Sequence, residues 1–475
     1  MLRCSLFLVT LSFLFAAAAR PGTAQGIRLL NLKDGAILRY PVPMLQGSLD
    51  DLAATSLTVR NQSSQRSTKE LQGIAHKGRF KALTELVPGA NKLLLQAGAR
   101  QLTVTLHYKP QTNPYLVQVV YVTDRSGNTK YQSPRPRDPQ DHQAKLDTVM
   151  KLLQSFTAER MNDLGFGRLT FNLELDRDGR LQVHTAQSER PASFYYKLSD
   201  VDFYTSVREW ADAQFPSPRA KKLVIAAYTR FDPKSGMVRG NTGRGGGSTA
   251  LFGSGSMWAW PSTLADVFPA FRDSAPVDGK LVFDDSAGSS TVWGLNATTT
   301  SVILHELGHT WDLPHTHDPR DIMSVQSFPR GFDFFNRYFT FVEPPSKRNP
   351  RRFEPAEKDI PYLAPISGAA VKNSRWFALE RKAWKDGDAP RFQRTGPATI
   401  VIEAPHGLAF LGIDVRGEAA AYKSWGSGGA KTLPRRLRLT AAELRKLAGT
   451  TDVRLRALDA EGQLTQVEAD KLAKP

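Results

Sequence analysis

Cysteine is almost absent from this chain of 475 residues, since the only one is Cys4. A disulfide needs a pair of cysteines, so the sequence excludes a disulfide framework within the chain. A mature form that begins after residue 25 would hold no thiol at all, and a cysteine could not then act as a switch on a metal. Packing, hydrogen bonds and ligands of other kinds must therefore hold the fold and any site.

Long apolar runs are also missing. No internal stretch reaches the roughly 18 apolar residues that a membrane-spanning helix needs. The shorter run from Leu6 to Ala18 follows Arg3 and precedes small residues. That layout is typical of a secretory signal peptide. We expect residues 1–25 to be a signal peptide, cleaved after Ala19 or Ala24, and the protein to be secreted or periplasmic. An uncleaved signal anchor is the alternative.

Acidic residues are in short supply, with 46 against 63 Lys and Arg, which gives a net charge of +17. Two clusters contribute, Lys347–Arg352 and Lys431–Arg438. Neither interleaves with aromatic residues as a single-stranded nucleic-acid platform would. We therefore expect no nucleic-acid partner. The basic surface is instead suited to lie near an anionic cell envelope.

The chain is long enough for about three domains, and 41% hydrophobic with 23% charged residues is typical of a globular protein. From residue 26 to 110, short runs with roughly period-two alternation are separated by turns, as in 56–60, 91–96 and 102–106. We predict an immunoglobulin-like β-sandwich without the usual cysteine pair. Pro110 to Pro114 marks its end.

Residues 111–345 alternate strand and helix patterns, which predicts an α/β or α+β catalytic domain. The Gly-rich stretch 240–247 matches neither a phosphate loop nor a dinucleotide fingerprint, so we predict a flexible loop there. We expect 248–260 to be extended. The other predicted strands are 116–122, 169–175 and 222–228, and the predicted helices are 145–161, 201–215 and 298–311.

Residues 346–475 look like a second β-rich, accessory domain. Strand patterns occur at 399–403, 409–415 and 453–457. Thr440 and Glu443 have the spacing of a capping box, which predicts a short helix that ends before Gly449. No internal repeat was found in the chain.

Histidine is concentrated in one place, with four of the nine between His305 and His317. His305 and His309 are four residues apart on a predicted helix, so both imidazoles share one face and can bind one ion. Zinc commonly takes imidazole nitrogens, and a catalytic zinc uses three protein ligands with one open position. The sequence therefore predicts a zinc site on this helix.

The third ligand is predicted from where the helix must stop. A continued helix would carry His315 about 15 Å along the axis from His305. Pro314 disfavours helix at the residue before it, and Asp312 belongs to the few residue types that accept the left-handed conformation. The chain can therefore turn back and bring His315 to the ion. His317 and Asp318 are rival third ligands.

Glu306 lies one step around the helix from His305. In that position it can reach water bound to the ion without binding the ion itself. We predict it as the general base. A structural zinc site needs no such group and usually closes its fourth position.

These residues carry a resemblance. His305 to His315 resembles the long metzincin consensus H-E-x-x-H-x-x-G-x-x-H, although Asp312 stands where that family has glycine. Asp321 to Ser324 resembles the Met-turn, which implies that Met323 packs beneath the metal; ordinary core packing is the alternative. Leu223 to Met323 is similar to the zinc metallopeptidase family best known from fungi, in which an accessory lectin-like domain can follow.

The resemblance implies a zinc-dependent endopeptidase that acts on a peptide or protein substrate, with a twisted sheet above the cleft, and the signal pattern of residues 1–25 predicts that it is exported. It also implies that Gly247 to Phe252 is the edge strand that pairs with substrate backbone. Two alternatives stay open: a zinc-stabilised envelope binding module without proteolytic activity, and a hydrolase of non-peptide amides. Oligomeric state is not predicted.

Overall fold

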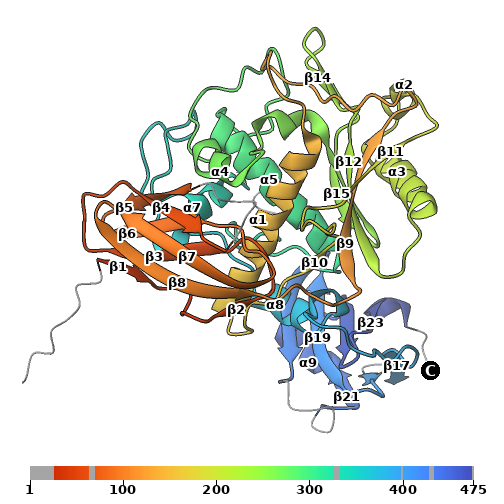
Figure 1. The fold of residues 1–475 in the computed structure, drawn as a ribbon. Coiled ribbons are helices and arrows are strands. Elements are labelled where there is room, and N and C mark those ends of the chain that lie inside the picture. The colour runs from red at the N-terminus through yellow and green to blue at the C-terminus, as the bar shows by residue number, and fades with distance from the viewer. Residues whose placement is uncertain (1–25, 64–69, 325–331, 397–398, 427–432, 473–475) are drawn as a thin grey trace, which may run out of the picture.

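The computed structural model describes residues 26–63, 70–324, 332–396, 399–426 and 433–472. Three β-rich or mixed regions follow one another along the chain (Figure 1). The predicted signal peptide, residues 1–25 with Cys4, lies outside the described residues. None of the helices within the described ranges combines the length and hydropathy needed to span a membrane.

The N-terminal region is all β and hydrogen-bonds as one eight-stranded sheet in the order β1-β3-β6-β5-β4-β7-β8-β2. All pairs are antiparallel except β2 with β8. Its own hydrophobic core contains large buried side chains such as Tyr40 and Phe80. The strands are β1 Ile27–Leu29, β2 Ile37–Leu38, β3 Met44–Leu49, β4 Ser56–Asn61, β5 Leu71–His76, β6 Arg79–Leu83, β7 Gly89–Ala97 and β8 Arg100–Tyr108.

The central region is a mixed α/β layer. Its sheet runs β10-β9-β12-β16-β15, with β11 also paired to β9. β9, β12 and β16 are parallel and β15 is antiparallel at the edge. The strands are β9 Leu116–Thr123, β10 Asn172–Leu173, β11 Val183–Gln187, β12 Ala220–Ala226, β15 Gly243–Gly246 and β16 Thr249–Gly253, and a separate hairpin comprises β13 Arg230–Asp232 and β14 Met237–Arg239.

Side chains of the parallel strands alternate between two cores, because successive residues of a strand point to opposite faces. Val119 and Leu223 face the core that contains α1 and α5, whereas Val120 and Val224 face α3. Figure 1 shows α1 and α5 on one side of the sheet and α3 on the other. The helices of this region are α1 His142–Asp163, α2 Ala192–Tyr195, α3 Asp200–Gln214, α4 Leu264–Ala270, α5 Val292–Thr310 and α7 Asn336–Phe339.

Two sequence predictions for this region need correction. The strand predicted at 169–175 shortens to β10, Asn172–Leu173, and an isolated bridge joins Leu175 to Leu181. The extended segment predicted at 248–260 ends at Gly253, where the chain turns into a short 3-10 helix, Ser254–Ala259. Trp258 and Trp260 are buried there, so apolar content alone did not distinguish the two conformations.

The C-terminal region holds two small antiparallel sheets, β17-β18-β21 and β20-β19-β22-β23. The predicted capping box is present: Thr440 and Glu443 cap α9, and Gly449 ends it with a φ of 73°. α8 precedes these sheets and packs in the same core as α5. The elements are α8 Pro365–Lys372, β17 Arg391–Gly396, β18 Thr399–Glu403, β19 Leu408–Val415, β20 Glu418–Ser424, β21 Arg436–Thr440, α9 Ala441–Ala448, β22 Arg454–Asp459 and β23 Leu464–Glu468.

Lys81 joins the N-terminal sheet to the central region. It is 5% exposed, and its ammonium donates to the carbonyls of Arg337, Tyr338 and Thr340 at 2.9–3.0 Å. These carbonyls end α7, where a cation is favoured by the helix dipole. Burial lowers the pKa of Lys81 to about 7. The three carbonyl contacts oppose that shift, because they stabilise the charged amine.

Candidate metal centre

Helix α5 carries the two histidines of the predicted motif. It begins at Val292, where the Thr291 side chain accepts a hydrogen bond from the backbone of Gly294. This start lies six residues before the predicted one. Nearly all of α5 is buried, between the sheet on one side and the segment around residues 332–339 on the other. A helix enclosed in this way holds His305 and His309 in fixed positions.

The structure brings His305, His309 and His315 together. The Nε2 atom of His309 lies 3.1 Å from that of His305 and 3.2 Å from that of His315. Two nitrogens bound at 2.0–2.1 Å to one tetrahedral zinc would lie about 3.3 Å apart. Among the described residues, this is the one group of histidine, cysteine and carboxylate side chains that meets the geometry of a metal site.

The second nitrogen of each helical imidazole shows what the cluster is built to hold. Nδ1 of His305 lies 2.7 Å from the carbonyl of Ile322, and Nδ1 of His309 lies 2.9 Å from that of Leu313. A carbonyl only accepts, so Nδ1 is the donor and Nε2 of each neutral ring is an unprotonated lone pair. Lone pairs that converge at 3.1 Å repel unless a cation lies between them. The site therefore fits a metal ion, with carbonyls orienting its ligands.

Burial favours the neutral imidazoles that metal binding requires. It lowers the pKa of His305 well below the usual value and that of His309 to about 4. Repulsion between neighbouring rings lowers both further. Burial also lowers the pKa of His315, although Glu418 opposes this. The three imidazoles are therefore neutral at neutral pH, the form that binds a metal ion.

The helix stops as predicted. α5 ends at Thr310, Trp311 caps it, and Asp312 takes the left-handed conformation with a φ of 60°. The backbone N–H groups of Asp312 and Leu313 donate to the carbonyls of His309 and Gly308, both at 3.1 Å. The chain thus folds back over the last turn of the helix and directs His315 toward its two partners. Asp312 serves where glycine would be usual, at the modest strain that Asp permits.

Neither rival third ligand lies in the cluster. His317 is 64% exposed and pairs with Glu418 at 2.8 Å. Asp318 pairs with Arg320, which holds its pKa low, at about 2. His315 itself contacts the C-terminal region: its N–H donates to the carbonyl of Gly417, and its carbonyl accepts from Ala419. No pattern in the sequence pointed to that contact, because it joins residues about 100 positions apart.

Glu306 is 8% exposed and lies against strand β15. Its carboxylate accepts a hydrogen bond from the backbone of Gly245. Burial raises the pKa of Glu306 to about 8, while the Arg244 guanidinium acts in the opposite direction. A divalent cation held by the adjacent imidazoles would lower that pKa, because it favours the ionised carboxylate. Glu306 is therefore a proton acceptor whose strength depends on the ion.

The Gly-rich stretch is a strand, which corrects the loop predicted at 240–247. Gly243–Gly246 form β15, paired antiparallel to β16. A Cβ atom on Gly245 would lie 2.0 Å from the carbonyl oxygen of Glu306. The glycines are needed because α5 packs directly on the strand backbone. The predicted edge strand, Gly247 to Phe252, is also wrong: β16 is internal, and β15 is the edge.

Met323 packs beneath the last turn of α5. It is fully buried, and a Cβ atom on Gly308 would lie 2.3 Å from its sulfur. The preceding residue, Ile322, supplies the carbonyl that orients His305. The segment is itself anchored by Asp321, whose carboxylate accepts from the Thr316 hydroxyl and the Ala364 backbone. Burial raises the pKa of Asp321 to about 6.

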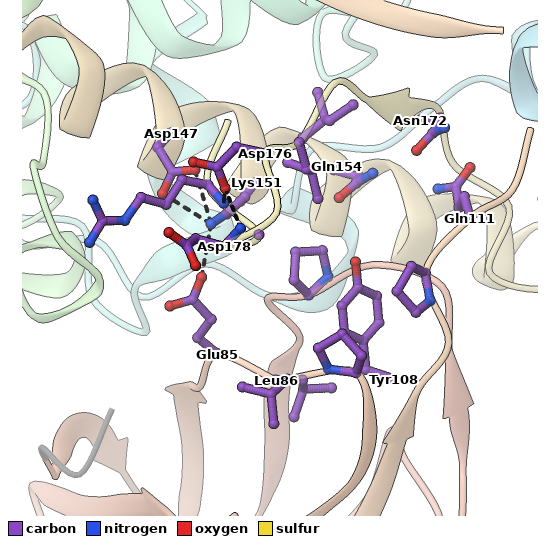
Figure 2. Close-up of a pocket in the computed structure, with 18 of the residues that line it drawn as sticks. Glu85, Leu86, Tyr108, Gln111, Asp147, Lys151, Gln154, Asn172, Asp176 and Asp178 are labelled. Atoms are coloured by element: carbon purple, nitrogen blue, oxygen red, sulfur yellow. Dashed lines mark hydrogen bonds and ion pairs between the residues drawn. The ribbon is translucent and has the colours of Figure 1, made fainter. Parts of the chain in front are cut away.

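A separate cavity of about 760 Å³ lies between the N-terminal sheet and α1. Figure 2 shows Lys151 among the residues that line it, joined to Glu85 and Asp147. Four basic and four acidic residues line the cavity, so its charge cancels within a strongly basic chain. Lys151 is nearly inaccessible to solvent, and its ammonium forms ion pairs with two carboxylates, Glu85 from the N-terminal region and Asp147 from α1. The pair with Glu85 connects the N-terminal region to α1, whereas Asp147 lies on α1 itself.

Comparison with known proteins places the chain in a family. The model of a family described as "Putative peptidase family" matches residues 26–403. Two curated relatives, both named as zinc metalloproteinases, come from Schizosaccharomyces pombe and Saccharomyces cerevisiae. They are 26% and 24% identical over 80% and 68% of this chain. The chain spans 64% and 50% of those relatives' own lengths.

Solved structures give a weaker likeness. OgpA from Akkermansia muciniphila has a TM-score of 0.45 at 16% identity over 76% of this chain and 95% of its own. It has also been solved in complex with an O-glycopeptide substrate. Archaemetzincin from Methanopyrus kandleri has a TM-score of 0.22 at 14% identity, over 46% of this chain and 86% of its own. Both scores are low, so neither likeness assigns chemistry to this chain.

Proposed function

This chain belongs to that peptidase family, which is matched over most of its length, and we propose that it is a zinc-dependent endopeptidase acting on peptide or protein substrates. The observation that carries the proposal is the convergence of three imidazole nitrogens, with the buried carboxylate of Glu306 next to His305 on the same helix. The names of the two fungal relatives support zinc as the ion.

His305, His309 and His315 would hold the zinc, which leaves the fourth position of a tetrahedral site open. Bound there, zinc would lower the pKa of a water molecule and polarise the carbonyl of the bond to be cleaved. The metzincin assignment is part of this proposal, supported by the ligand spacing, the turn at Asp312 and the buried Met323.

Glu306 is the proposed general base. It lies next to His305 on α5 but is not one of the three converging ligands. Its carboxylate would take a proton from the attacking water and later deliver it to the leaving amine. The hydrogen bond from Gly245 orients the carboxylate, so the proton acceptor is fixed before substrate arrives.

Strand β15 is the proposed docking edge for substrate backbone. It is the last strand of its sheet, and it packs against α5 at Glu306. An extended peptide added to this edge would form main-chain hydrogen bonds alongside the proposed base. On that strand the Arg244 side chain pairs with Asp200 of α3, and the neighbouring glycines have only backbone groups to offer.

The finer fold assignments belong to the same proposal. The N-terminal region is all β, almost entirely antiparallel, and has a hydrophobic core of its own, which supports an immunoglobulin-like module. The two C-terminal sheets support a β-rich accessory domain. The proposal of export is supported by the sequence pattern of residues 1–25. The proposal of a location beside an anionic envelope is supported by the net charge of +17.

The test is an assay of purified protein against unstructured peptide libraries, with and without chelator. We expect internal cleavage that chelator abolishes and zinc restores, and one zinc per chain by elemental analysis. Tight zinc binding without cleavage of any peptide would favour the binding-module alternative. Cleavage of simple amides, with no cleavage of peptides, would favour the alternative of a non-peptide amide hydrolase.

A further inference from the structure

The C-terminal β-domain contacts the metal centre at His315, the one ligand of the three that does not lie on α5. His305 and His309 lie on α5, where the helix fixes their backbone. His315 lies in a segment, residues 311–318, that contains neither helix nor a named strand. Something outside α5 must therefore fix the third ligand if all three nitrogens are to meet.

The backbone of His315 is bonded to the turn between β19 and β20. Its N–H donates to the Gly417 carbonyl at 3.3 Å, and the Ala419 N–H donates to its carbonyl at 2.8 Å. Together these bonds form a parallel bridge between His315 and Glu418. The ligand is in effect a one-residue extension of the C-terminal sheet, which Figure 1 shows beneath the central region.

Arg456 makes a second contact, at the start of the turn. Its Nη1 donates to the carbonyl of Asp312 at 3.0 Å. Asp312 is the left-handed residue at which the chain leaves α5. Arg456 therefore binds the turn at Asp312, three residues before His315. It does so from a strand that lies 144 residues after Asp312 in the sequence.

Arg456 is itself rigidly held. It is 3% exposed and forms a two-bond ion pair with buried Asp414, at 2.7 and 3.0 Å. The Phe410 ring lies 5.6 Å from the guanidinium. Gly412 leaves the necessary room, since a Cβ atom there would lie 2.7 Å from Nη2. All these partners come from β19, next to β22.

A buried ion pair of this kind is a poor source of stability. Apolar residues of similar volume often replace such pairs with no loss, because both charges must be desolvated. Geometry is the better account, since the planar guanidinium can pair with Asp414 and still donate to the Asp312 carbonyl.

We propose that the C-terminal β-domain completes the metal centre: Arg456, locked by Asp414, and the β19–β20 turn at Gly417–Ala419 position His315 on the ion. Arg456 is a positioning residue that touches neither ion nor substrate. The inference rests on the proposed zinc peptidase function and deepens it, because it assigns a role to a domain outside the catalytic motif.

The test compares two ion pairs on the same strand. The double variant Arg456→Met/Asp414→Leu removes the buried pair without leaving an unpaired charge. Arg454→Met removes the exposed pair between β22 and β23, Arg454 with Glu468, and serves as the matched control. Zinc affinity is measured by chelator competition, the ligand geometry by the visible spectrum of the cobalt form, and stability by the melting temperature of the metal-free protein.

We expect the double variant to lose roughly 10–100-fold in zinc affinity, as when outer-shell partners of metal ligands are changed. Its cobalt spectrum should change, while its metal-free melting temperature stays close to that of wild type. Arg454→Met should match wild type in all three measurements. Wild-type affinity and spectrum in a folded double variant would overturn the proposal.

Arg456→Lys keeps the charge but not the planar fork, and it covers the case in which the double variant does not fold. This variant should bind zinc more weakly than wild type, because its ammonium cannot reproduce the paired contacts to Asp414 and the bond to the Asp312 carbonyl. Equal zinc affinity in the Arg456→Lys variant and the wild type would count against positioning. Failure of this inference is distinct from failure of the proposed function, since the latter would appear as wild-type protein that binds no zinc or cleaves no peptide.

Discussion

The two sides of the metal centre are held by different kinds of structure. His305 and His309 are four residues apart on one buried helix, so local geometry brings their imidazoles together. His315 reaches the same point through a turn that is bonded to a domain about 100 residues further on. The helical side is specified by nearby sequence, whereas the turn side depends on tertiary contacts and should be the more easily disturbed.

Removal of single ligands should have the largest effect. His305→Ala, His309→Ala and His315→Ala should each abolish measurable hydrolysis and lose most bound zinc, because two imidazoles do not complete a catalytic site. His317→Ala is the matched control and should keep full zinc occupancy by elemental analysis, since His317 is exposed and outside the cluster. Zinc loss in His317→Ala with retention in His315→Ala would reverse the assignment of the turn side.

Glu306→Gln should separate chemistry from metal binding on the helical side. Hydrolysis should fall by roughly 10²–10⁴-fold, the usual contribution of a positioned base. Zinc content should stay at the wild-type level, because Glu306 is not among the converging ligands. Peptide cleavage rates and elemental analysis of the same preparation check both points. Loss of zinc in this variant would identify Glu306 as a ligand instead.

Asp321→Asn tests the turn side through pH. Burial raises the pKa of Asp321 to about 6 in the folded protein, against about 3.9 in an unfolded chain. The folded state thus binds this proton more tightly, so the contribution to stability is complete below about pH 4 and is lost as pH rises through about 6. The loss amounts to about 3 kcal/mol at most.

The Asn variant lacks this titration while keeping the size of the side chain. Its stability relative to wild type should therefore improve between about pH 4 and about pH 7. Urea unfolding of both metal-free proteins, with chelator present at each pH, measures the difference directly. An unchanged difference between the two pH values would show that the carboxyl is already ionised in the fold, held so by Thr316 and Ala364.

Two glycine substitutions should have the smallest effects, and they compare how rigidly β15 and Met323 pack against α5. Gly245→Ala drives a methyl group into the backbone of α5 at Glu306, and overpacking of this kind costs roughly 1–3 kcal/mol. Gly308→Ala meets only the flexible end of Met323, so its cost should be smaller. Thermal unfolding of both variants provides the ranking, and a larger cost at Gly308 would show that Met323 cannot move.

The helical part of the site could be predicted from sequence because the cause is local. The spacing of His305 and His309, the stop before Pro314 and the left-handed Asp312 all follow from neighbouring residues. Strand β15 could not be found in this way. Its glycines have low strand propensity, and their purpose, close approach to α5, is visible only after folding.

The contribution of the C-terminal domain was beyond prediction for a related reason. Arg456 is 42 residues from Asp414 and 144 residues from Asp312, and no periodicity links the three. The strands that carry Asp414 and Arg456 were predicted, at 409–415 and 453–457 respectively, within two residues of their observed ends. Which charged side chains would turn inward could not be predicted, since a buried ion pair and an exposed one have the same composition.

The Lys81 contact has a consequence for how the chain assembles. The Lys81 ammonium donates to carbonyls at the C-terminal end of α7. Met44 and Leu83 from the same sheet belong to the hydrophobic cluster that contains α5. A cut at residue 110 would leave three carbonyls without their donor and open that cluster to water. The N-terminal sheet is therefore part of the packing that encloses α5, and it cannot be removed as a separate module without cost.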